Sequence, residues 1–400
     1  MPAENNDKPV TRKLKVLHLI TQFAVGGATE PAITTCRLLS DAGYATRILA
    51  GETDPGQETL HEYAKSAGVR VETLASMRRS IHPIHDYRCY IDLVKYMRLH
   101  KFDIVHTHSS KAGFLGRMAA AKASVPVILH NIHGWGHHDN MGRSARMVYV
   151  HAERTAAKVT DRLLVVANAN AEKGLKDGIG TRDQYETVYN GIDLDRFIQV
   201  DVDVPQLKDS LGIPKDAMVV GTVSRLAPQK APDDFLRMAA HIHASAPHVH
   251  FVYVGGGPLE KQFTATIAEL GLGNVVHALG YRSDVPELLR VFDVFVLTSL
   301  WEGLPIVFAQ AMCANLPIVA TDVDGAPEAI KDGVNGFLVQ PKKPIEQATR
   351  VLELLLNSTL RKSMGSAGAA RVADQFAERS MVNHIQRIYD EIARSKGIID

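Results

Sequence analysis

Short runs of aliphatic and β-branched residues alternate with longer stretches of helical periodicity along this chain, and the pattern occurs twice. A run of this kind is typical of a strand that is buried on both faces of a parallel sheet and covered by helices. The first strands are expected at 14–20, 45–50, 103–106, 125–130, 162–167 and 186–189. After a polar, proline-containing stretch at 198–216, further strands are expected at 217–223, 248–254, 274–279, 293–297, 317–320 and 336–339. The sequence therefore predicts two α/β domains in tandem, followed by a segment at 346–395 that is helical throughout.

The composition narrows the class of partner. The 400 residues are 46% hydrophobic, which is enough for two domains that each bury a core. Because 45 basic residues oppose 44 acidic ones and no basic block occurs, nucleic acid is not expected as the main partner. No repeat and no low-complexity segment is visible, which disfavours a long binding scaffold.

The same sequence predicts a reducing, cytoplasmic location. Cys36, Cys89 and Cys313 are far apart and form no C-x-x-C pair, so neither a disulfide framework nor a structural zinc site is indicated. No apolar run approaches the roughly 18 to 20 residues of a membrane span. Residues 1–13 are polar, lack the apolar centre of a signal peptide and are expected to be disordered.

The segment from Thr298 to Glu328 has polar groups only at the turns between strand, helix and strand. The strand at 293–297 is followed by the loop Glu302-Gly303-Leu304 and by Pro305, which suits the first turn of a helix. Free N–H groups and the positive end of the helix dipole would then face this loop, where a diphosphate could bind. Gly303 would permit close approach of that ligand.

Two cations occupy a second strand-to-helix loop. The strand at 217–223 ends just before Arg225 and Lys230, and a helix is expected at 232–244. An arginine can fork onto two phosphate oxygens, and a lysine supplies a mobile positive charge. The alternative is that both residues are solvated surface cations.

Glycines mark two further turns between a strand and a helix. Gly26 and Gly27 follow the first strand, and the run Gly255 to Gly257 follows the strand at 248–254. Glycine lets the backbone approach an anionic ligand closely. Neither turn carries the G-x-G-x-x-G fingerprint of a dinucleotide site, so a plain turn remains the alternative for both.

Histidines gather near two expected strand ends. His106 and His108 share one face of a strand because of its two-residue period. Further candidates for a zinc site are His130, His133, His137, His138 and Asp139. The spacing typical of a closed zinc site is absent, and histidines at strand ends often only line a cleft wall, so no metal site is expected.

Taken in order, these segments resemble the family 4 retaining glycosyltransferases. The resemblance implies the GT-B fold, in which two doubly wound, Rossmann-like parallel-sheet domains face a central cleft. In that family a loop glutamate is followed eight positions later by a second glutamate. Glu302 matches the first, whereas Gln310 occupies the second position. Asp324 likewise replaces the first glycine of a turn that the family commonly writes with two.

The resemblance also implies a role for each motif. Arg225 and Lys230 would clamp the diphosphate of a nucleoside-diphosphate sugar, and Glu302 would hold the sugar ring. His133, which we favour over His130, would orient the transferred sugar from the first domain. The other donor-site positions of the family match Gly26, Gly27, Gly257, Tyr281, Arg282, Gly303, Leu304, Pro305 and Gln310.

The reaction expected from this resemblance is sugar transfer with retention of configuration, the leaving phosphate helping to deprotonate the acceptor hydroxyl. Since cations and a helix end would stabilise the leaving diphosphate, no metal or other cofactor is expected, and the nucleotide sugar is a co-substrate. Gln310 lacks a carboxylate, so weaker nucleotide binding is expected. The expected acceptor is a saccharide or lipid-linked saccharide of lipopolysaccharide or exopolysaccharide assembly. Peripheral contact with the inner face of the plasma membrane is left open.

The expected domains follow from the alternation and the resemblance together. Residues 14–197 would form the acceptor-side domain, and residues 198–375 the domain that binds the nucleotide sugar. Residues 376–400 would form a helix that crosses back to the first domain.

Other classes of function remain open. Gln310 and Asp324 would suit a catalytically weakened protein that acts as a binding subunit. A nucleotide-sugar epimerase would share the architecture but would convert its donor without an acceptor. A nicotinamide oxidoreductase is disfavoured because neither domain has the dinucleotide fingerprint. The helix expected at 143–158 mixes apolar and basic residues, for which a solvated face is a better explanation than a membrane-facing one.

Overall fold

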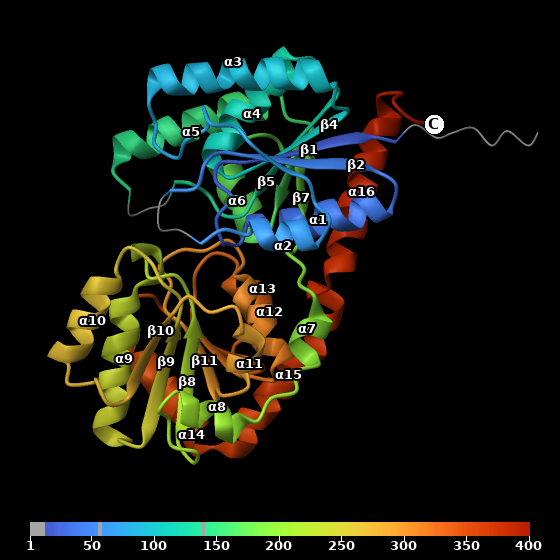
Figure 1. Ribbon diagram of the computed structural model, residues 1–400. Helices are drawn as coiled ribbons and strands as arrows, with labels where there is room; N and C mark the ends of the chain where they lie inside the picture. The colour runs from blue at the N-terminus through green and yellow to red at the C-terminus, as the bar shows by residue number, and fades with distance from the viewer. Residues whose placement is uncertain (1–12, 55–57, 138–140) are drawn as a thin grey trace, which may run out of the picture. The chain divides into compact units, whose positions relative to one another are not determined.

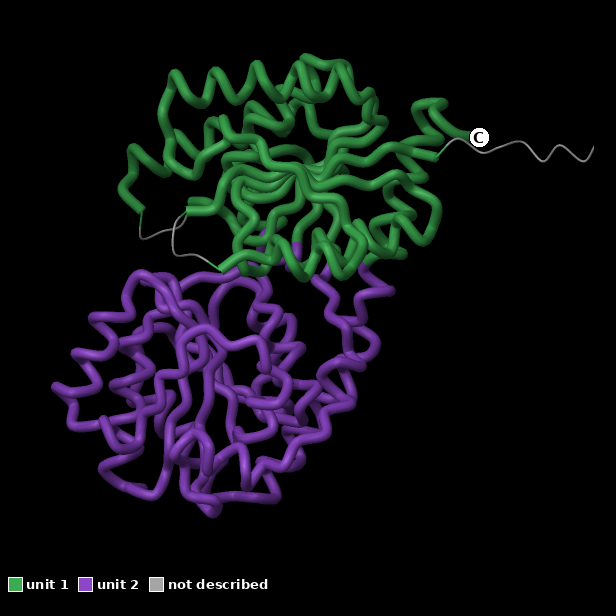
Figure 2. Tube along the Cα trace, viewed as in Figure 1, with its two compact units in different colours: residues 1–165, 171–188, 382–400 green, residues 166–170, 189–381 purple. Residues whose placement is uncertain are grey.

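The computed structural model describes residues 13–54, 58–137 and 141–400 (Figure 1). The chain forms two compact units (Figure 2). Unit 1 comprises residues 1–165, 171–188 and 382–400, and unit 2 comprises residues 166–170 and 189–381. The division therefore falls at 188 and 189, whereas the sequence places the boundary at 197 and 198. The expected disorder of the N-terminus falls on residues 1–12, outside the described part of the chain.

Unit 1 is built on a seven-stranded sheet with the order β3-β2-β1-β4-β5-β6-β7, and every neighbouring pair is parallel. Its strands are β1 Lys15–Ile20, β2 Ala45–Ala50, β3 Val71–Thr73, β4 Ile104–His108, β5 Val127–Ile132, β6 Arg162–Val165 and β7 Tyr185–Thr187. All but β3 were predicted. This edge strand has only three residues and is partly exposed, so it lacks the apolar run that identifies the others.

Helices cover both faces of this sheet (Figure 1). One face carries α3 Pro83–His100, α4 Ser110–Lys122 and α5 Arg143–Ala157, and the other carries α1 Thr29–Asp41, α2 His61–Ser66 and the C-terminal helix α16 Glu378–Ser395. Side chains of β1 alternate between the two cores: Leu17 and Leu19 pack under α3 and α4, and Ile20 packs with residues of α1. The short helix α6 Asn168–Lys176 follows β6.

Unit 2 contains a six-stranded parallel sheet with the order β10-β9-β8-β11-β12-β13. The strands are β8 Met218–Val223, β9 Val249–Val254, β10 Val276–Gly280, β11 Val294–Leu297, β12 Ile318–Thr321 and β13 Gly336–Val339. All six were predicted, because each is a short apolar run between turn residues.

The helices of unit 2 also form two layers. One core contains residues of α9 Pro232–Ser245, α10 Glu260–Glu269 and α14 Pro344–Leu356, and the other contains residues of α11 Val285–Leu289, α12 Ile306–Cys313 and α15 Ser358–Phe376. Three shorter helices are α7 Leu194–Ile198, α8 Val204–Ser210 and α13 Ala326–Ala329.

Two stretches have more local structure than their composition indicates. The polar stretch at 198–216 contains α8, which starts where Asp203 accepts a hydrogen bond from the backbone N–H of Gln206 at 3.0 Å. The segment at 346–395 is helical, as predicted, and is divided among α14, α15 and α16. Asn357, with φ −122°, caps α15 through the N–H of Leu360, and Ala377 separates α15 from α16 in an extended conformation.

In both sheets the strand order reverses between two central strands, β1 and β4 in unit 1 and β8 and β11 in unit 2. Ligands of open α/β sheets bind beyond the carboxyl ends of the strands at this switch point. The loops that follow these four strands are therefore the candidate site loops. None of the helices in the described part of the chain is long and apolar enough to cross a membrane.

Candidate functional site

The switch point of unit 2 brings two charged loops together. Arg225 follows β8, Lys230 ends the short 3-10 helix Pro228–Lys230 in the same loop, and Glu302 follows β11. Hydrogen bonds join the loops: the N–H of Leu300 donates to the carbonyl of Gln229 at 2.8 Å, and the Thr298 hydroxyl donates to the carbonyl of Lys230 at 2.7 Å. The loops thus form one framework at the carboxyl edge of the sheet.

The Glu302 carboxylate is 8% exposed and is held by its neighbours. The Ser299 hydroxyl donates to Oε1 at 2.6 Å, and the Lys230 ammonium forms an ion pair with the same oxygen. The Gln229 amide donates to Oε2 at 3.5 Å, which is a weak contact. A buried carboxylate requires such partners, so Lys230 and Ser299 both fix its orientation. Ser299 was not among the predicted site residues, although it lies in the same loop as Glu302.

Asp324 holds the backbone of this loop. Its Oδ2 accepts a hydrogen bond from the N–H of Glu302 at 2.6 Å, and the N–H of Gly325 donates to the carbonyl of Gly303 at 3.0 Å. Asp324 has φ +43°, in the left-handed region that a glycine would adopt without strain. Where the family has a glycine, this chain therefore has a carboxylate that contacts the Glu302 loop.

Helix α12 begins at Ile306, and Pro305 is its N-cap residue with φ −62° and ψ 121°. No side chain caps the first turn, so its N–H groups face the loop at Gly303 and Leu304. Gln310 lies in this helix and is 8% exposed, and no atom of its amide is both buried and without a hydrogen-bond partner among the described residues.

The predicted glycine turns differ in what the fold requires of them. Gly257 has φ +154°, and a Cβ there would lie 2.4 Å from the carbonyl oxygen of Leu226, so the turn after β9 needs a glycine. Gly26 and Gly27, between β1 and α1, have no positive φ, and a Cβ at either would meet no atom within 4 Å. The fold therefore does not require glycine at positions 26 and 27.

The predicted base-contacting residues follow β10. Tyr281 is 46% exposed. One edge of the Arg282 guanidinium is engaged, with Nε donating to Oδ1 of Asp284 at 2.8 Å and Nη2 donating to Oδ2 at 2.5 Å. This contact lowers the pKa of Asp284. The contact with Asp284 uses Nε and Nη2, so Nη1 is the nitrogen of Arg282 that could donate to a base while the pair stays intact.

The histidines of unit 1 lie on both faces of its sheet. His106 and His108 of β4 lie on the face of His18, and His130 of β5 contacts Thr107 on the other face, with Nδ1 2.9 Å from Oγ1. His133, just after β5, has Nε2 3.0 Å from Nδ1 of His108. Burial lowers the pKa of all five histidines.

The zinc alternative involves these residues only in part. His137 is paired with Asp177 at 2.8 Å, away from the others, and His138 and Asp139 lie outside the described residues. Among the described residues, ligand atoms of His18, His106 and His108 lie within 4.8 Å of one another.

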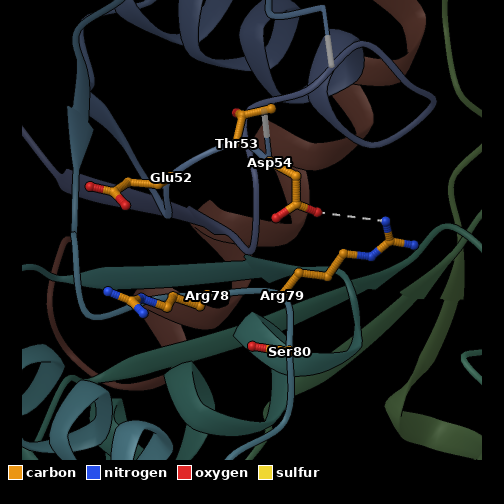
Figure 3. A pocket seen from close by; sticks show the side chains of 6 residues that line it. All are labelled: Glu52, Thr53, Asp54, Arg78, Arg79 and Ser80. Carbon is orange, nitrogen blue, oxygen red and sulfur yellow. Dashed lines mark ion pairs between the residues drawn. The ribbon is translucent and has the colours of Figure 1, made fainter. Parts of the chain in front are cut away.

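A polar pocket of about 500 Å³ lies beyond the carboxyl ends of β2 and β3 in unit 1 (Figure 3). It is lined by Glu52, Thr53, Asp54, Arg78, Arg79 and Ser80. Arg79 points toward Asp54 across the pocket, at 3.9 Å. This separation is long for an ion pair between exposed groups, so the contact is weak.

Apolar side chains are exposed directly after this pocket. Ile81, just before α3, and Ile84 and Tyr87, in its first turns, are 72%, 73% and 67% exposed. They follow Arg78 and Arg79 directly in the sequence.

The two parallel-sheet units have the fold of the GT-B class, as predicted. Comparison with known families gives the particular family. The chain belongs to the family 4 (group 1) glycosyltransferases: residues 25–196 match Glycosyltransferase Family 4, and residues 203–371 match Glycosyl transferases group 1.

Individual relatives agree with this assignment. The chain is 29% identical to the UDP-Gal:alpha-D-GlcNAc-diphosphoundecaprenol alpha-1,3-galactosyltransferase of Escherichia coli, over 97% of this chain and all of the relative. It is 31% identical to the D-inositol 3-phosphate glycosyltransferase of Geodermatophilus obscurus, over 73% of this chain and 67% of that protein. Among solved structures, Anabaena Alr3699/HepE in complex with UDP-glucose has a TM-score of 0.82 at 23% identity, covering 94% of this chain and all of that one.

Proposed function

We propose that this glycosyltransferase transfers a hexosyl group from a UDP-sugar, with retention of configuration, to a hydroxyl of a saccharide linked to a polyprenyl diphosphate. The observation that carries the proposal is the pairing of Lys230 with Glu302 beside Arg225, where β8 and β11 end. A lysine and an arginine can take up the charge of a departing diphosphate, and a carboxylate can bind the hydroxyls of a sugar.

The ion pair explains how the donor site is kept ready while it is empty. Without a ligand, Lys230 and Glu302 neutralise each other in a partly buried place. When a donor binds, its diphosphate replaces the carboxylate as the partner of Lys230, and sugar hydroxyls replace the ammonium as donors to Glu302. The Ser299 hydroxyl keeps its contact with Oε1, so the carboxylate does not turn away.

The transfer step needs no covalent enzyme intermediate. The bond between the anomeric carbon and the phosphate oxygen breaks as the bond to the acceptor oxygen forms on the same face. The acceptor proton passes to the leaving phosphate, whose negative charge Arg225, Lys230 and the N–H groups of α12 stabilise. Since these groups supply the positive charge, we expect transfer to continue when EDTA removes divalent metal ions.

The remaining predicted residues take supporting roles in this proposal. His133 orients the transferred sugar, and Gly26 and Gly27 let the backbone approach the ligand. A role in binding is consistent with the finding that the fold has room for a Cβ at both positions. The turn at Gly257, together with Tyr281 and Arg282, lies next to the base. Gln310 binds the ribose through its amide, and Gly303, Leu304 and Pro305 form the loop before α12.

The acceptor is proposed from the relatives and from unit 1. The E. coli relative and a 26% identical transferase of Campylobacter jejuni are both named for acceptors on diphosphoundecaprenol and for alpha-1,3 transfer. The pocket with Arg78 and Arg79 suits a diphosphate, and the exposed Ile81, Ile84 and Tyr87 suit the surface of a membrane. We therefore place the enzyme at the cytoplasmic face of the membrane, as a peripheral protein.

A transfer assay tests this proposal. The full chain is incubated with UDP-galactose or UDP-N-acetylgalactosamine and with N-acetylglucosaminyl diphosphate on a short polyprenyl chain, in detergent, with and without EDTA. The anomeric configuration of the product is read by NMR. An α product is expected from these α-linked donors, and a β product would refute retention. Replacing both Arg78 and Arg79 by alanine should raise the KM for the acceptor and not for the donor.

A second candidate function is a catalytically weakened binding subunit, which is favoured by Gln310 in the place of the second motif glutamate. Such a protein would bind UDP without forming product. An epimerase would convert the donor when no acceptor is present, which the same assay detects.

A further inference from the structure

Three histidines of unit 1 form a continuous chain of hydrogen bonds. Nδ1 of His18 lies 3.0 Å from Nε2 of His108, and Nδ1 of His108 lies 3.0 Å from Nε2 of His133. In both pairs the ring centroids are 5.3 Å apart, and the ring planes differ by 17° and 25°. These values place the facing nitrogens close to the line between the ring centres. The rings therefore meet edge to edge, in the geometry of a strong N–H···N bond.

The chain runs from the core to the surface. His18 is completely buried, His108 is 3% exposed and His133 is partly exposed. At the inner end, the hydroxyl of Tyr389 on α16 lies 3.5 Å from Nε2 of His18 and 2.7 Å from Nδ1 of His106. At the outer end, the Asn131 amide nitrogen lies 2.8 Å from Nε2 of His133.

The imidazoles in this chain are neutral at physiological pH. Burial lowers the pKa of His18 to about 3 and that of His133 to about 4, and it holds the pKa of His108 well below the usual range. A neutral imidazole has one N–H donor and one lone pair. Each contact in the chain therefore has one donor and one acceptor, and the direction of a single bond determines the direction of all the others.

The Asn131 amide does not determine that direction. Its nitrogen lies 2.8 Å from Nε2 and 3.3 Å from Nδ1 of His133, so it sits over the ring and not in line with the lone pair or N–H of Nε2, which faces Nδ1 of His108. If Nδ1 of His18 donates to Nε2 of His108, then Nδ1 of His108 donates to Nε2 of His133, and all three histidines carry their proton on Nδ1.

His106 and Tyr389 determine the direction of the chain. Nδ1 of His106 donates to the hydroxyl of Tyr389, and this hydroxyl then donates to Nε2 of His18. Nε2 of His106 then carries a lone pair and no proton. Nε2 of His106 is buried without a partner. In the opposite direction Tyr389 would donate to His106, which would leave a buried N–H without an acceptor. An orphaned buried N–H is less common than an acceptor in that position.

A metal ion fits this arrangement less well than hydrogen bonds do. The rings of His106 and His108 stack face to face, with centroids 4.5 Å apart and an angle of 27° between planes. Lone pairs of stacked rings run side by side and do not converge on one point. A zinc ion bound by His18, His106 and His108 would also break the bond between His18 and His108.

From this geometry we infer that His18 and His108 are positioning residues that hold His133 in the Nδ1–H tautomer, so that His133 offers an N–H donor to its ligand. No oxygen among the described residues accepts from that N–H. The inference rests on the proposed function in one respect, namely that the ligand is the transferred sugar. An N–H at this place donates to a sugar oxygen, and the polarised chain behind it strengthens the bond.

Ring nitrogen NMR of the full chain labelled with ¹⁵N-histidine tests the tautomers without any substrate. Substitutions of single histidines by glutamine assign the signals. The expected result is that His18, His108 and His133 all have a protonated Nδ1 and an unprotonated Nε2 at pH 7.5. A protonated Nε2 on His133 would overturn the inference, and so would a shift of the His106 and His108 signals caused by one equivalent of Zn²⁺. Either result can be read even if the protein transfers no sugar.

Kinetics of matched variants test the consequence. His108→Leu removes the donor to His133 and should lower kcat about tenfold or more, with little change in the donor KM, because His133 is no longer oriented. His108→Gln keeps an amide donor and should recover most of the rate. His130→Leu is the control, since His130 is equally buried on the opposite face. Equal rates for His108→Leu and His108→Gln would refute the positioning role.

A double substitution separates this inference from the proposed function. In a His133→Ala background, His108→Leu should have no further effect on kcat. If His133→Ala keeps full activity, the proposed role of His133 is wrong, whereas the tautomers measured by NMR are unaffected by that outcome.

Discussion

At the scale of single residues, the loop after β11 depends on Asp324 as much as on Glu302. The carboxylate of Asp324 accepts from the N–H of Glu302 at 2.6 Å, and Asp324 keeps a left-handed backbone with φ +43°. Glycine at this position would relieve strain of about 1 to 2 kcal/mol. It would also remove a hydrogen bond to a charged group, which contributes about 1.5 to 3 kcal/mol.

We therefore expect Asp324→Gly to change the melting temperature little, because the two effects oppose each other, but to lower kcat, because the Glu302 loop loses its anchor. Asp324→Asn keeps an acceptor oxygen and tolerates the left-handed conformation, so it should behave like the parent enzyme. Thermal unfolding and initial rates on the same preparations measure both effects. A fully active glycine variant would show that the carboxylate does not position the loop.

A second prediction at this scale concerns Gln310, which lies in α12 at the position of the second motif glutamate. A carboxylate accepts hydrogen bonds from both ribose hydroxyls more strongly than a neutral amide does. The difference of about 0.5 to 2 kcal/mol predicts that Gln310→Glu tightens UDP binding about 2- to 30-fold. Isothermal titration calorimetry gives the dissociation constants. An unchanged or weaker affinity would exclude the ribose contact.

At the scale of elements, the start of α6 depends on a residue far away in sequence. Glu328, in α13, accepts hydrogen bonds from the backbone N–H groups of Asn168 and Ala169 at 3.0 and 2.9 Å, and from the Tyr189 hydroxyl at 2.9 Å. These contacts place a negative charge at the N-terminus of the helix, where the dipole favours it.

Glu328→Ala should therefore destabilise the protein by about 1 to 3 kcal/mol, because it leaves two helix N–H groups without their carboxylate. Glu346→Ala is the matched control, since Glu346 forms only an exposed pair with Lys343 at 3.4 Å. Urea unfolding measures the difference. If both variants lose the same stability, Glu328 is not a helix cap.

The elements also show what the sequence could predict. Strands such as β8 and β11 were predictable because a short apolar run between turn residues is a local signal. The break at Ala377 lies next to the start of the helix expected at 376–400, whereas the break at Asn357 was not predicted, although Asn357 and Ser358 are residue types that often cap a helix. His106 and His108 could be placed on one face by their spacing, but their neighbour Tyr389 lies 283 residues from His106 and no local pattern indicates it.

The candidate site was predictable to a similar degree. The loop positions of Arg225, Lys230 and Glu302 follow from the ends of predicted strands. The contact of Asp324 with the N–H of Glu302 depends on how two loops pack, so the sequence could not distinguish it from a solvent-facing carboxylate.

At the scale of the whole molecule, buried neutral histidines make the stability of unit 1 sensitive to acid. The pKa values of His18, His106, His108, His130 and His133 are lowered by burial, so the folded state binds fewer protons than the unfolded state once the pH falls below about 6.5. Their contribution to stability is complete above that pH and decreases as the pH falls toward the folded pKa values.

Each such histidine should remove up to about 1.4 kcal/mol of stability per pH unit below 6.5. We expect the melting temperature to be nearly constant from pH 8 to 7 and to fall steeply from pH 6.5 to 5, where most carboxylates are still ionised. His18→Gln should flatten this decline, although it lowers stability at pH 7.5. A melting temperature that is independent of pH from 7 to 5 would contradict the neutral chain of histidines.

The central claim for the whole molecule is that unit 2 binds a nucleoside diphosphate through Arg225 and Lys230. The most direct test is thermal stabilisation of the full chain by UDP, GDP, ADP and CMP, with Arg225→Ala in parallel. A ligand at 100 times its dissociation constant adds about 2.7 kcal/mol of stability. The account predicts selective stabilisation by UDP that Arg225→Ala abolishes without loss of the fold. No stabilisation by any nucleotide at millimolar concentration, or equal stabilisation of the Arg225→Ala variant, would contradict it.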